Sequence, residues 1–214
     1  FGACARVRLA AFTGVAAMTL GLGARTITSQ YRTGVRKFKP QLDGNAALEL
    51  QSAAGLGESI LDLVDEISFV GRATFGKMDH RKQEARAEWL KKVGLAQDDP
   101  RRRWGNSGRI LSGDPSQLPP IGELEIIDDS TPGSEYDQKG RDEWRSITDV
   151  IQLWRCHRQK GDATYAEECL RLRDGTFTEA DWRSWMKRDL ARGEFTDDER
   201  AKFERGNALD LTGT

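Results

Sequence analysis

The chain has 214 residues, which is enough for one complete domain, or for one domain and part of another. Hydrophobic residues make up 37% of it and include six Trp and eight Phe, so a packed core is expected and wholesale disorder is excluded. The formal net charge of −1 excludes a uniformly basic coat, and any binding of nucleic acid must use a local face.

The first two thirds of the chain alternate short apolar runs with longer helical stretches, a pattern typical of an α/β fold with a parallel sheet. The runs predicted as strands are residues 7–11, 60–64, 109–112 and 147–153. Residues 15–20 are predicted to be the start of a helix. A second helix is predicted over residues 81–93, where Trp89, Leu90 and Val93 form the apolar side. The polar segment 97–108, with Pro100 and three consecutive Arg, is predicted to be a surface loop.

The last third is predicted to be helical. Tyr165, Cys169 and Leu172 fall at helical spacing, and Gly175 ends that segment. Thr178 followed by Asp181 has the pattern of a helix N-cap. An apolar stripe of core or docking character follows, made of Trp182, Trp185, Met186 and Leu190. Thr196 and Glu199 cap one more short helix.

The charge is unevenly distributed along the chain. Residues 1–42 contain seven basic residues and no acidic one, residues 81–109 have a net charge of +5, and residues 122–149 one of −6. Such blocks are commonly solvated faces, and the alternative is a contact with a polyanion near the N-terminus. The uncharged run 9–24 after Arg6 and Arg8 resembles a signal peptide, but turn residues interrupt it and it is too short to span a bilayer.

The three cysteines do not form a disulfide framework, since Cys4, Cys156 and Cys169 are odd in number and lack paired spacing. A metal site built from Cys156, His157 and Cys169 is conceivable, but it lacks a fourth nearby ligand and the short ligand pairs of structural zinc sites. We therefore expect a reducing, intracellular compartment.

Two adjacent carboxylates end the second predicted strand. Asp65 and Glu66 follow a mostly apolar run, in which Asp62 is an unusual charged residue. Ligands of open α/β sheets bind at this end of the strands. One carboxylate there can hold Mg²⁺ and the next can orient or deprotonate an attacking water, which is the requirement of nucleotide hydrolysis. Adjacent acids after a buried strand are common, so the motif alone is weak.

The next strand leads into a more restrictive string, Gly-Asp-Pro-Ser-Gln-Leu-Pro-Pro-Ile at residues 113–121. Gly113 allows a tight exit from the strand, and Pro119 with Pro120 fixes an extended path. Gln117 is thereby held where its amide can sense a terminal phosphate. The plain alternative is a loop stiffened by prolines.

At these residues the chain resembles the petite-integration-frequency (Pif-type) DNA helicases, a RecD-related branch of superfamily one. Residues 11–17 (Ala-Phe-Thr-Gly-Val-Ala-Ala) resemble the family's Ala-Pro-Thr-Gly-x-Ala-Ala segment, and residues 25–29 (Arg-Thr-Ile-Thr-Ser) its Thr-Ile-His-Ser element. The acidic motif at residues 65–68, the glutamine motif at 113–121 and Arg158-Gln159 follow in the family's order, so the matches run from about Val7 to Trp182.

The resemblance implies a RecA-like parallel sheet flanked by helices. Residues 1–125 would be a partial first motor domain, and residues 126–214 a linker with the beginning of a second. It also implies an ATP-dependent DNA helicase that uses ATP and Mg²⁺ and acts on single-stranded DNA and duplex junctions in repair, recombination or telomere maintenance. No membrane partner is expected, and the implied location is the nucleus or mitochondrion.

The resemblance also assigns roles to single residues. Asp65 would hold the metal, Glu66 would activate water, and Gln117 would sense the terminal phosphate. Arg158 would stabilise charge on the transferred phosphoryl group, so that Asp65, Gln117 and Arg158 face the nucleotide. Contacts with the DNA backbone fall to Thr13, Gly14, Thr28 and Ser29.

The chain also departs from the family pattern. Phe12 replaces a Pro, Thr28 replaces a His, Arg6 and Arg8 charge a strand that should be buried, and residues 82–106 are irregular. The departures at Phe12, Thr28 and Asp62 favour an alternative, a non-catalytic remnant that binds nucleic acid or a protein. The retention of four site residues together argues against it, namely Asp65, Glu66, Gln117 and Arg158.

The phosphate-binding loop of the family is expected before residue 1, and its later motifs after residue 214. The string at residues 71–77 satisfies G-x-x-x-x-G-K, but Met78 follows where Ser or Thr should bind magnesium, and the family has a helix there. We therefore expect a fragment that does not hydrolyse ATP by itself.

Overall fold

The structure is a computed structural model that describes residues 6–34, 38–52, 55–153 and 161–187, together with residues 197 and 201. The chain divides into two compact units, one up to Val150 and one from Ile151 onward. Each unit is described by itself.

A parallel sheet forms the centre of the first unit. Its strands are β1 (Val7–Ala11), β2 (Arg25–Thr26), β3 (Leu61–Asp65) and β4 (Gly108–Leu111), in the spatial order β2-β1-β3-β4. All neighbouring strands are parallel, so their carboxyl ends meet at one edge of the sheet. This arrangement confirms the predicted α/β class and three of the predicted strands. The short β2 was not predicted.

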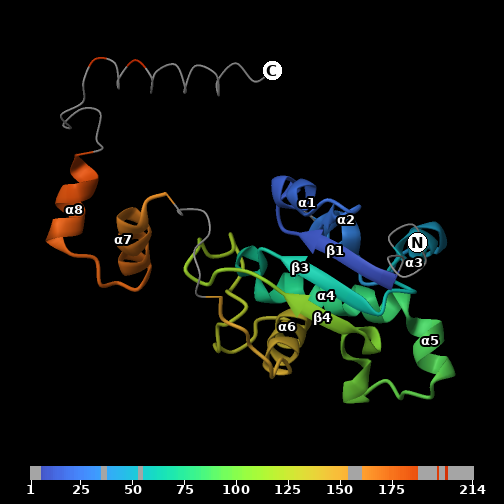
Figure 1. Ribbon diagram of the computed structural model, residues 1–214. Coiled ribbons are helices and arrows are strands. Elements are labelled where there is room, and N and C mark those ends of the chain that lie inside the picture. Colours follow the sequence, from blue (N-terminus) through green and yellow to red (C-terminus); the bar gives the residue numbers. More distant parts are fainter. Residues whose placement is uncertain are drawn as a thin grey trace. The chain divides into compact units, whose positions relative to one another are not determined.

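Helices surround this sheet (Figure 1). Their bounds are α1 Gly14–Leu20, α2 Ile27–Tyr31, α3 Gly44–Gln51, α4 Arg72–Ala85, α5 Ala87–Lys92 and α6 Glu135–Arg145, with 3₁₀ helices at Ile67–Phe69 and Pro100–Asn106. In Figure 1, α4 runs behind the strands and α6 lies below them. The helix predicted over 81–93 is therefore two helices, which join at Arg86, where the backbone leaves the helical region.

The hydrophobic core lies between the sheet and α4. Val64 of β3 packs in one cluster with Phe75 and Met78 of α4, and with Trp104 of the second 3₁₀ helix. β3 alternates between buried and half-buried residues, so one face of the sheet carries most of the core. The core therefore fixes the position of β3, whose end carries the two predicted acidic residues.

The prediction of a surface loop at residues 97–108 is wrong at Trp104, which is buried beside an ion pair of Asp62 and Lys82. The Asp62 carboxylate is completely buried and accepts hydrogen bonds from Ser59 Oγ at 2.9 Å and Trp104 Nε1 at 2.7 Å. Lys82 Nζ forms an ion pair with Asp62 at 2.9 Å, and neither side chain is exposed. Burial lowers the pKa of Lys82, while Asp62 opposes that shift. Trp104 is therefore a core residue, and Asp62 is the acceptor that holds it.

Close contact between α4 and α6 holds residues 126–150 in the first compact unit. A methyl group at Gly76 would overlap the backbone of Tyr136, and one at Gly140 that of Arg72. The buried Arg72 guanidinium also donates to both carboxylate oxygens of Asp137, at 2.6 and 2.8 Å. Such tight packing, together with a bidentate ion pair, joins residues 126–150 to the first unit.

The segment 147–153 is not the predicted fourth strand. It has no regular secondary structure, and Val150, Ile151 and Leu153 are 86%, 89% and 88% exposed. A short apolar run becomes a strand only where a neighbouring strand can pair with it. The sheet is instead completed by β2.

Two buried acidic residues, Asp79 and Glu143, lie on α4 and α6. Burial raises the pKa of Asp79 on α4. Burial and the nearby Asp79 raise the pKa of Glu143 on α6 to about 7. Glu143 pairs with Arg109 of β4 at 2.9 Å. α6 is thereby connected to the last strand of the sheet.

The second unit contains α7 (Ala163–Arg173) and α8 (Glu179–Met186), as predicted. The Thr178 side chain caps α8 in a capping box with Asp181, which also pairs with Arg171 of α7 at 2.5 Å. Trp185 packs between the helices and donates to Glu168 at 2.8 Å, whereas Trp182 is exposed. Leu190, Thr196 and Glu199 lie outside the described residues.

Within the described part of the chain, no helix has the length and apolar character that crossing a bilayer requires.

Candidate functional site at the carboxyl edge of the sheet

The ends of β3 and β4 are connected through their side chains and backbone. Ser112 Oγ, directly after β4, donates to Asp65 Oδ1 at 2.6 Å. The Ser112 backbone also accepts from Ile67 N at 2.9 Å and donates to Val64 O at 2.8 Å. Gly113 then leaves the strand so close to Ile67 that a methyl group there would crowd it. The acidic motif and the glutamine motif are therefore fixed to each other where their strands end.

Glu66 lies against the end of β1. Its backbone is in the left-handed region, with φ 58° and ψ 38°. Its Oε2 accepts two hydrogen bonds from Thr13, one from the backbone N at 3.0 Å and one from Oγ1 at 2.9 Å. Two residues to which the resemblance assigned separate roles, water activation and DNA contact, are thus in direct contact.

Gln117 lies in a turn that begins after β4. Its backbone N donates to Asp114 O at 3.0 Å, and Ser116 N donates to Asp114 Oδ1 at 2.9 Å. The Gln117 side chain is exposed and has no hydrogen-bond partner within the described ranges. It follows the same carboxyl edge as Asp65 and Glu66, and in the described part of the chain it forms no hydrogen bond with either carboxylate.

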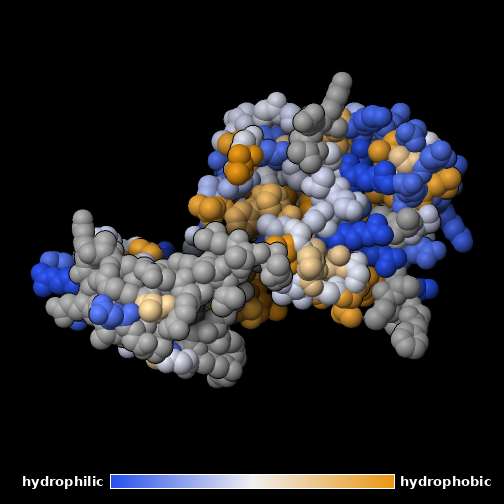
Figure 2. All heavy atoms as spheres, turned by 90° about the horizontal axis from the view of Figure 1, so that it is seen from above, coloured by the Kyte–Doolittle hydropathy of each residue, from blue (hydrophilic) through white to orange (hydrophobic). Residues whose placement is uncertain are grey.

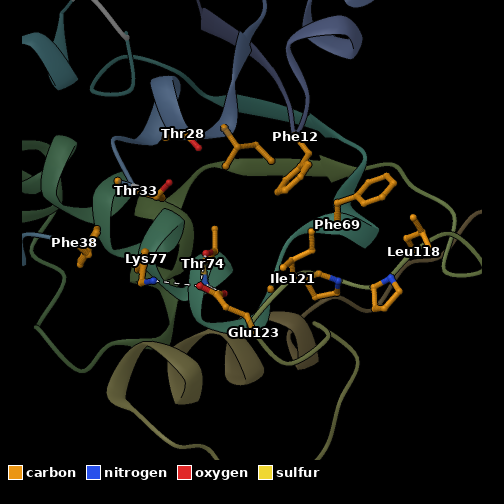
Figure 3. A pocket seen from close by; sticks show the side chains of 15 residues that line it. Phe12, Thr28, Thr33, Phe38, Phe69, Thr74, Lys77, Leu118, Ile121 and Glu123 are labelled. Carbon is orange, nitrogen blue, oxygen red and sulfur yellow. Dashed lines mark hydrogen bonds and ion pairs between the residues drawn. The ribbon is translucent and has the colours of Figure 1, made fainter. Parts of the chain in front are cut away.

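A cavity of about 380 Å³ opens between the end of β1, the start of α2 and the proline-containing loop (Figure 3). The rings of Phe12 and Phe69 are stacked on one side of it, with centroids 5.6 Å apart. Thr28, Leu118 and Ile121 line other sides. Phe12, which replaces the family's Pro, therefore has a defined packing partner.

Lys77 and Thr74 at the floor of this cavity are both bound by Glu123, as the dashed lines in Figure 3 show. Glu123 Oε2 accepts from Thr74 N at 2.8 Å and its Oε1 from Thr74 Oγ1 at 2.8 Å, while Lys77 Nζ lies 3.4 Å away. The string at residues 71–77 is thus the beginning of α4, and its lysine pairs with a carboxylate. This agrees with the helix expected there.

The acidic residues of the edge fit one part of a magnesium site. Asp65 Oδ1 accepts from Ser112, and its other oxygen has no hydrogen-bond partner in the part of the chain that the structure describes. In that part, no three His, Cys, Asp or Glu side chains are grouped to hold a metal. Mg²⁺ at nucleotide sites is typically held by one or two carboxylates, with water and phosphates as its other ligands. A single free carboxylate oxygen fits that role.

The remaining predicted site residues are only partly grouped. Gly14 follows Thr13 at the start of α1, with open space around its Cα. Thr28 and Ser29 are exposed on α2, and Thr28 reaches the cavity. Arg158 lies outside the described residues, as do Cys156 and His157 of the conceivable metal site.

Sequence reasoning did not identify three residues that shape the site, namely Ser112, Phe69 and Glu123. Only Ser112 had a local signal, because it lies between the strand and the glutamine motif. The surface around this edge is mixed. Figure 2 shows exposed hydrophobic atoms on one part of the first unit, while hydrophilic atoms predominate toward α3 and α5.

No family model matches the sequence, and no curated protein matches it either. Solved structures do. A Pif1 helicase from Candida albicans is similar over 86% of this chain and 37% of its own, with 23% identity and a TM-score of 0.61. A Bacteroides Pif1 helicase in complex with ADP-AlF3 and single-stranded DNA is similar over 98% of this chain and 48% of its own, with 17% identity and a TM-score of 0.57. A structure of two coordinating Pif1 helicases at forked duplex DNA has a TM-score of 0.53 and 18% identity, over 85% of this chain and 41% of its own.

The chain therefore spans less than half the length of these solved helicases. The comparison confirms the resemblance stated from the motifs at the level of fold: over most of its length this chain has the RecA-like α/β fold of the Pif1 helicases.

Proposed function

We propose that this chain is a segment of an ATP-dependent DNA helicase that couples ATP hydrolysis to movement along single-stranded DNA and to duplex unwinding. The process we propose for it is repair, recombination or telomere maintenance. The observation that carries the proposal is the order of side chains along one sheet edge. The ends of β1, β3 and β4 supply Thr13, then Glu66 and Asp65, then Ser112, within hydrogen-bond contact of each other in pairs.

The chemistry of these groups supports phosphoryl transfer to water. When bound, Mg²⁺ would neutralise charge on the terminal phosphates. Asp65, oriented by Ser112, would hold the ion through its free oxygen. Glu66 would orient the attacking water and accept its proton, and Gln117 would contact the terminal phosphate from its exposed turn. Arg158 would stabilise the charge that develops on the transferred group.

The DNA-binding part of the proposal rests on the neighbouring surface. Thr13, Gly14, Thr28 and Ser29 follow the ends of β1 and β2, and hydroxyl and backbone N–H groups of this kind bind phosphates without reading base sequence. The solved helicases with similar folds include one bound to single-stranded DNA and ADP-AlF3. Nucleotide and DNA would thus meet at one edge of the sheet.

The experiment is DNA-stimulated ATP hydrolysis by a version of the protein extended at both ends, compared with the chain alone. We expect turnover only from the extended protein, and we expect Glu66→Gln to abolish it. Glu88→Gln, an exposed residue of α5, is the matched control that should leave turnover unchanged. Full turnover by Glu66→Gln would remove Glu66 from its role. An extended protein that binds DNA but never hydrolyses ATP would instead identify a non-catalytic remnant.

A further inference from the structure

The contact between Glu66 and Thr13 uses up the donors of Thr13. A threonine hydroxyl has one proton to donate, and the Thr13 backbone N–H is a second and last donor. Both point to the same Glu66 oxygen, at 2.9 and 3.0 Å. The hydroxyl oxygen meanwhile accepts from Ala16 N at 3.1 Å, which fixes its orientation. No donor of Thr13 is left for another anion while Glu66 stays in this position.

The proposed function gives the same two donors a different acceptor, namely an oxygen of the DNA backbone. A carboxylate oxygen and a phosphate oxygen are both charged acceptors, and each would use the same N–H and O–H groups. They cannot both accept the single hydroxyl proton. The close approach of two anions would also be repulsive.

We infer that Thr13 is a positioning residue for Glu66, and that the Glu66 carboxylate and a DNA phosphate compete for it. Without DNA, Thr13 holds the carboxylate at the end of β1 by two hydrogen bonds. A phosphate at Thr13 displaces the carboxylate toward the nucleotide side of the edge. This inference rests on the proposed function, and it explains how strand binding would be sensed at the hydrolysis site.

Two geometric features support an exchange between two positions over a permanent contact. Thr13 is half-buried and Gly14 has open space around it, so a ligand can reach this pair. Asp65, the neighbouring carboxylate, is held by Ser112 and not by Thr13. The two acidic residues are thus tied to different strands, and Glu66 can move without disturbing the proposed metal ligand.

The test measures binding of a fluorescent oligothymidylate to this chain at low salt by anisotropy. Glu66→Ala removes the internal competitor, and Asp65→Ala is the matched control, because it removes the same charge from the adjacent position but leaves Thr13 occupied. We expect both variants to bind more tightly than the unmodified chain. Glu66→Ala should exceed Asp65→Ala by about 2- to 10-fold, the range that corresponds to about one net hydrogen bond.

Variants of Thr13 test whether its hydroxyl group binds DNA once Glu66 is removed, or serves only as the N-cap of α1. In the Glu66→Ala background, Thr13→Val should remove most of the extra gain, and Thr13→Ser, which keeps the hydroxyl, should retain it. Circular dichroism spectra of all variants verify that each is folded. Equal tightening by Glu66→Ala and Asp65→Ala would overturn the competition and leave the proposed function intact. Absence of binding by every folded variant would overturn the DNA-binding function and the inference together.

Discussion

Asp62 offers the sharpest test of how the first unit is held together. Asp62→Asn keeps the shape of the side chain but only one of the two oxygens that accept from Ser59 and Trp104, and it removes the charge opposite Lys82. At 2.9 Å and an effective dielectric constant of about 20, the lost attraction is about 6 kcal/mol. Local relaxation reduces that figure, and breaking a buried pair from one side costs about 3–5 kcal/mol. We expect a loss of this size in the free energy of unfolding.

The measurement is urea unfolding of the chain at pH 7, followed by circular dichroism. Asp98→Asn, an exposed carboxylate on the polar segment, is the control and should stay within about 0.5 kcal/mol of the unmodified chain. The double variant Asp62→Asn/Lys82→Met should recover most of the loss, because it no longer buries an unpaired charge. A single variant that loses less than about 1 kcal/mol would refute the reasoning, and so would a double variant as unstable as the single one.

Three further predictions concern the packing of α4 and α6. Burial raises the pKa of Glu143 to about 7, above its unfolded value, so the folded state binds an extra proton between about pH 4.5 and 7. The free energy of unfolding should therefore fall by up to about 3 kcal/mol as pH rises through that window, and Glu143→Gln should flatten the profile; an unchanged profile would contradict the assignment. Gly140→Ala should destabilise the unit by about 1–3 kcal/mol in urea unfolding, because its methyl group meets the backbone of α4. Gly133→Ala, in open space, should not, and equal effects of the two would show that α4 and α6 are less close. Arg72→Lys should lower the melting temperature, since an ammonium cannot make the bidentate contact with Asp137, and an unshifted transition would mean that this contact adds no stability.

Much of the sheet could be predicted from the sequence, since buried parallel strands have a local signature. β1 was predicted at its observed bounds, and β3 and β4 each to within one residue at either end. The apolar run at residues 147–153 has the same local signature, yet among the described residues no strand pairs with it, and Val150, Ile151 and Leu153 are exposed. β2 has only two residues, too few for any periodicity to indicate.

The errors elsewhere come from contacts between residues distant in sequence. The segment around Trp104 looked like a surface loop, but the Trp104 indole binds Asp62, 42 positions away, and its backbone N binds Asp79. The start of α4 was expected only through the resemblance, because Gly76 weakens its helical pattern; Gly76 is accommodated because α6 packs directly on it.

The residues of the candidate site could be predicted from the sequence, but the hydrogen bonds between them could not. Asp65 and Glu66 end the strand that was expected to carry them, and the glutamine motif follows the adjacent strand. Their partners Ser112 and Thr13 follow β4 and β1, and pairings between strands depend on the register of the sheet, which no local pattern gives. The roles of these residues, and that of Gln117, remain predictions.

Because the backbone of Glu66 is left-handed, stability and the proposed chemistry favour different residues at position 66. For an L-residue this conformation costs roughly 1–2 kcal/mol, and glycine would avoid most of that cost. Glycine would also delete the carboxylate on which the proposed chemistry depends. A mutant library selected only for thermostability should therefore tolerate glycine at this position, whereas selection for growth that depends on the proposed activity should eliminate it.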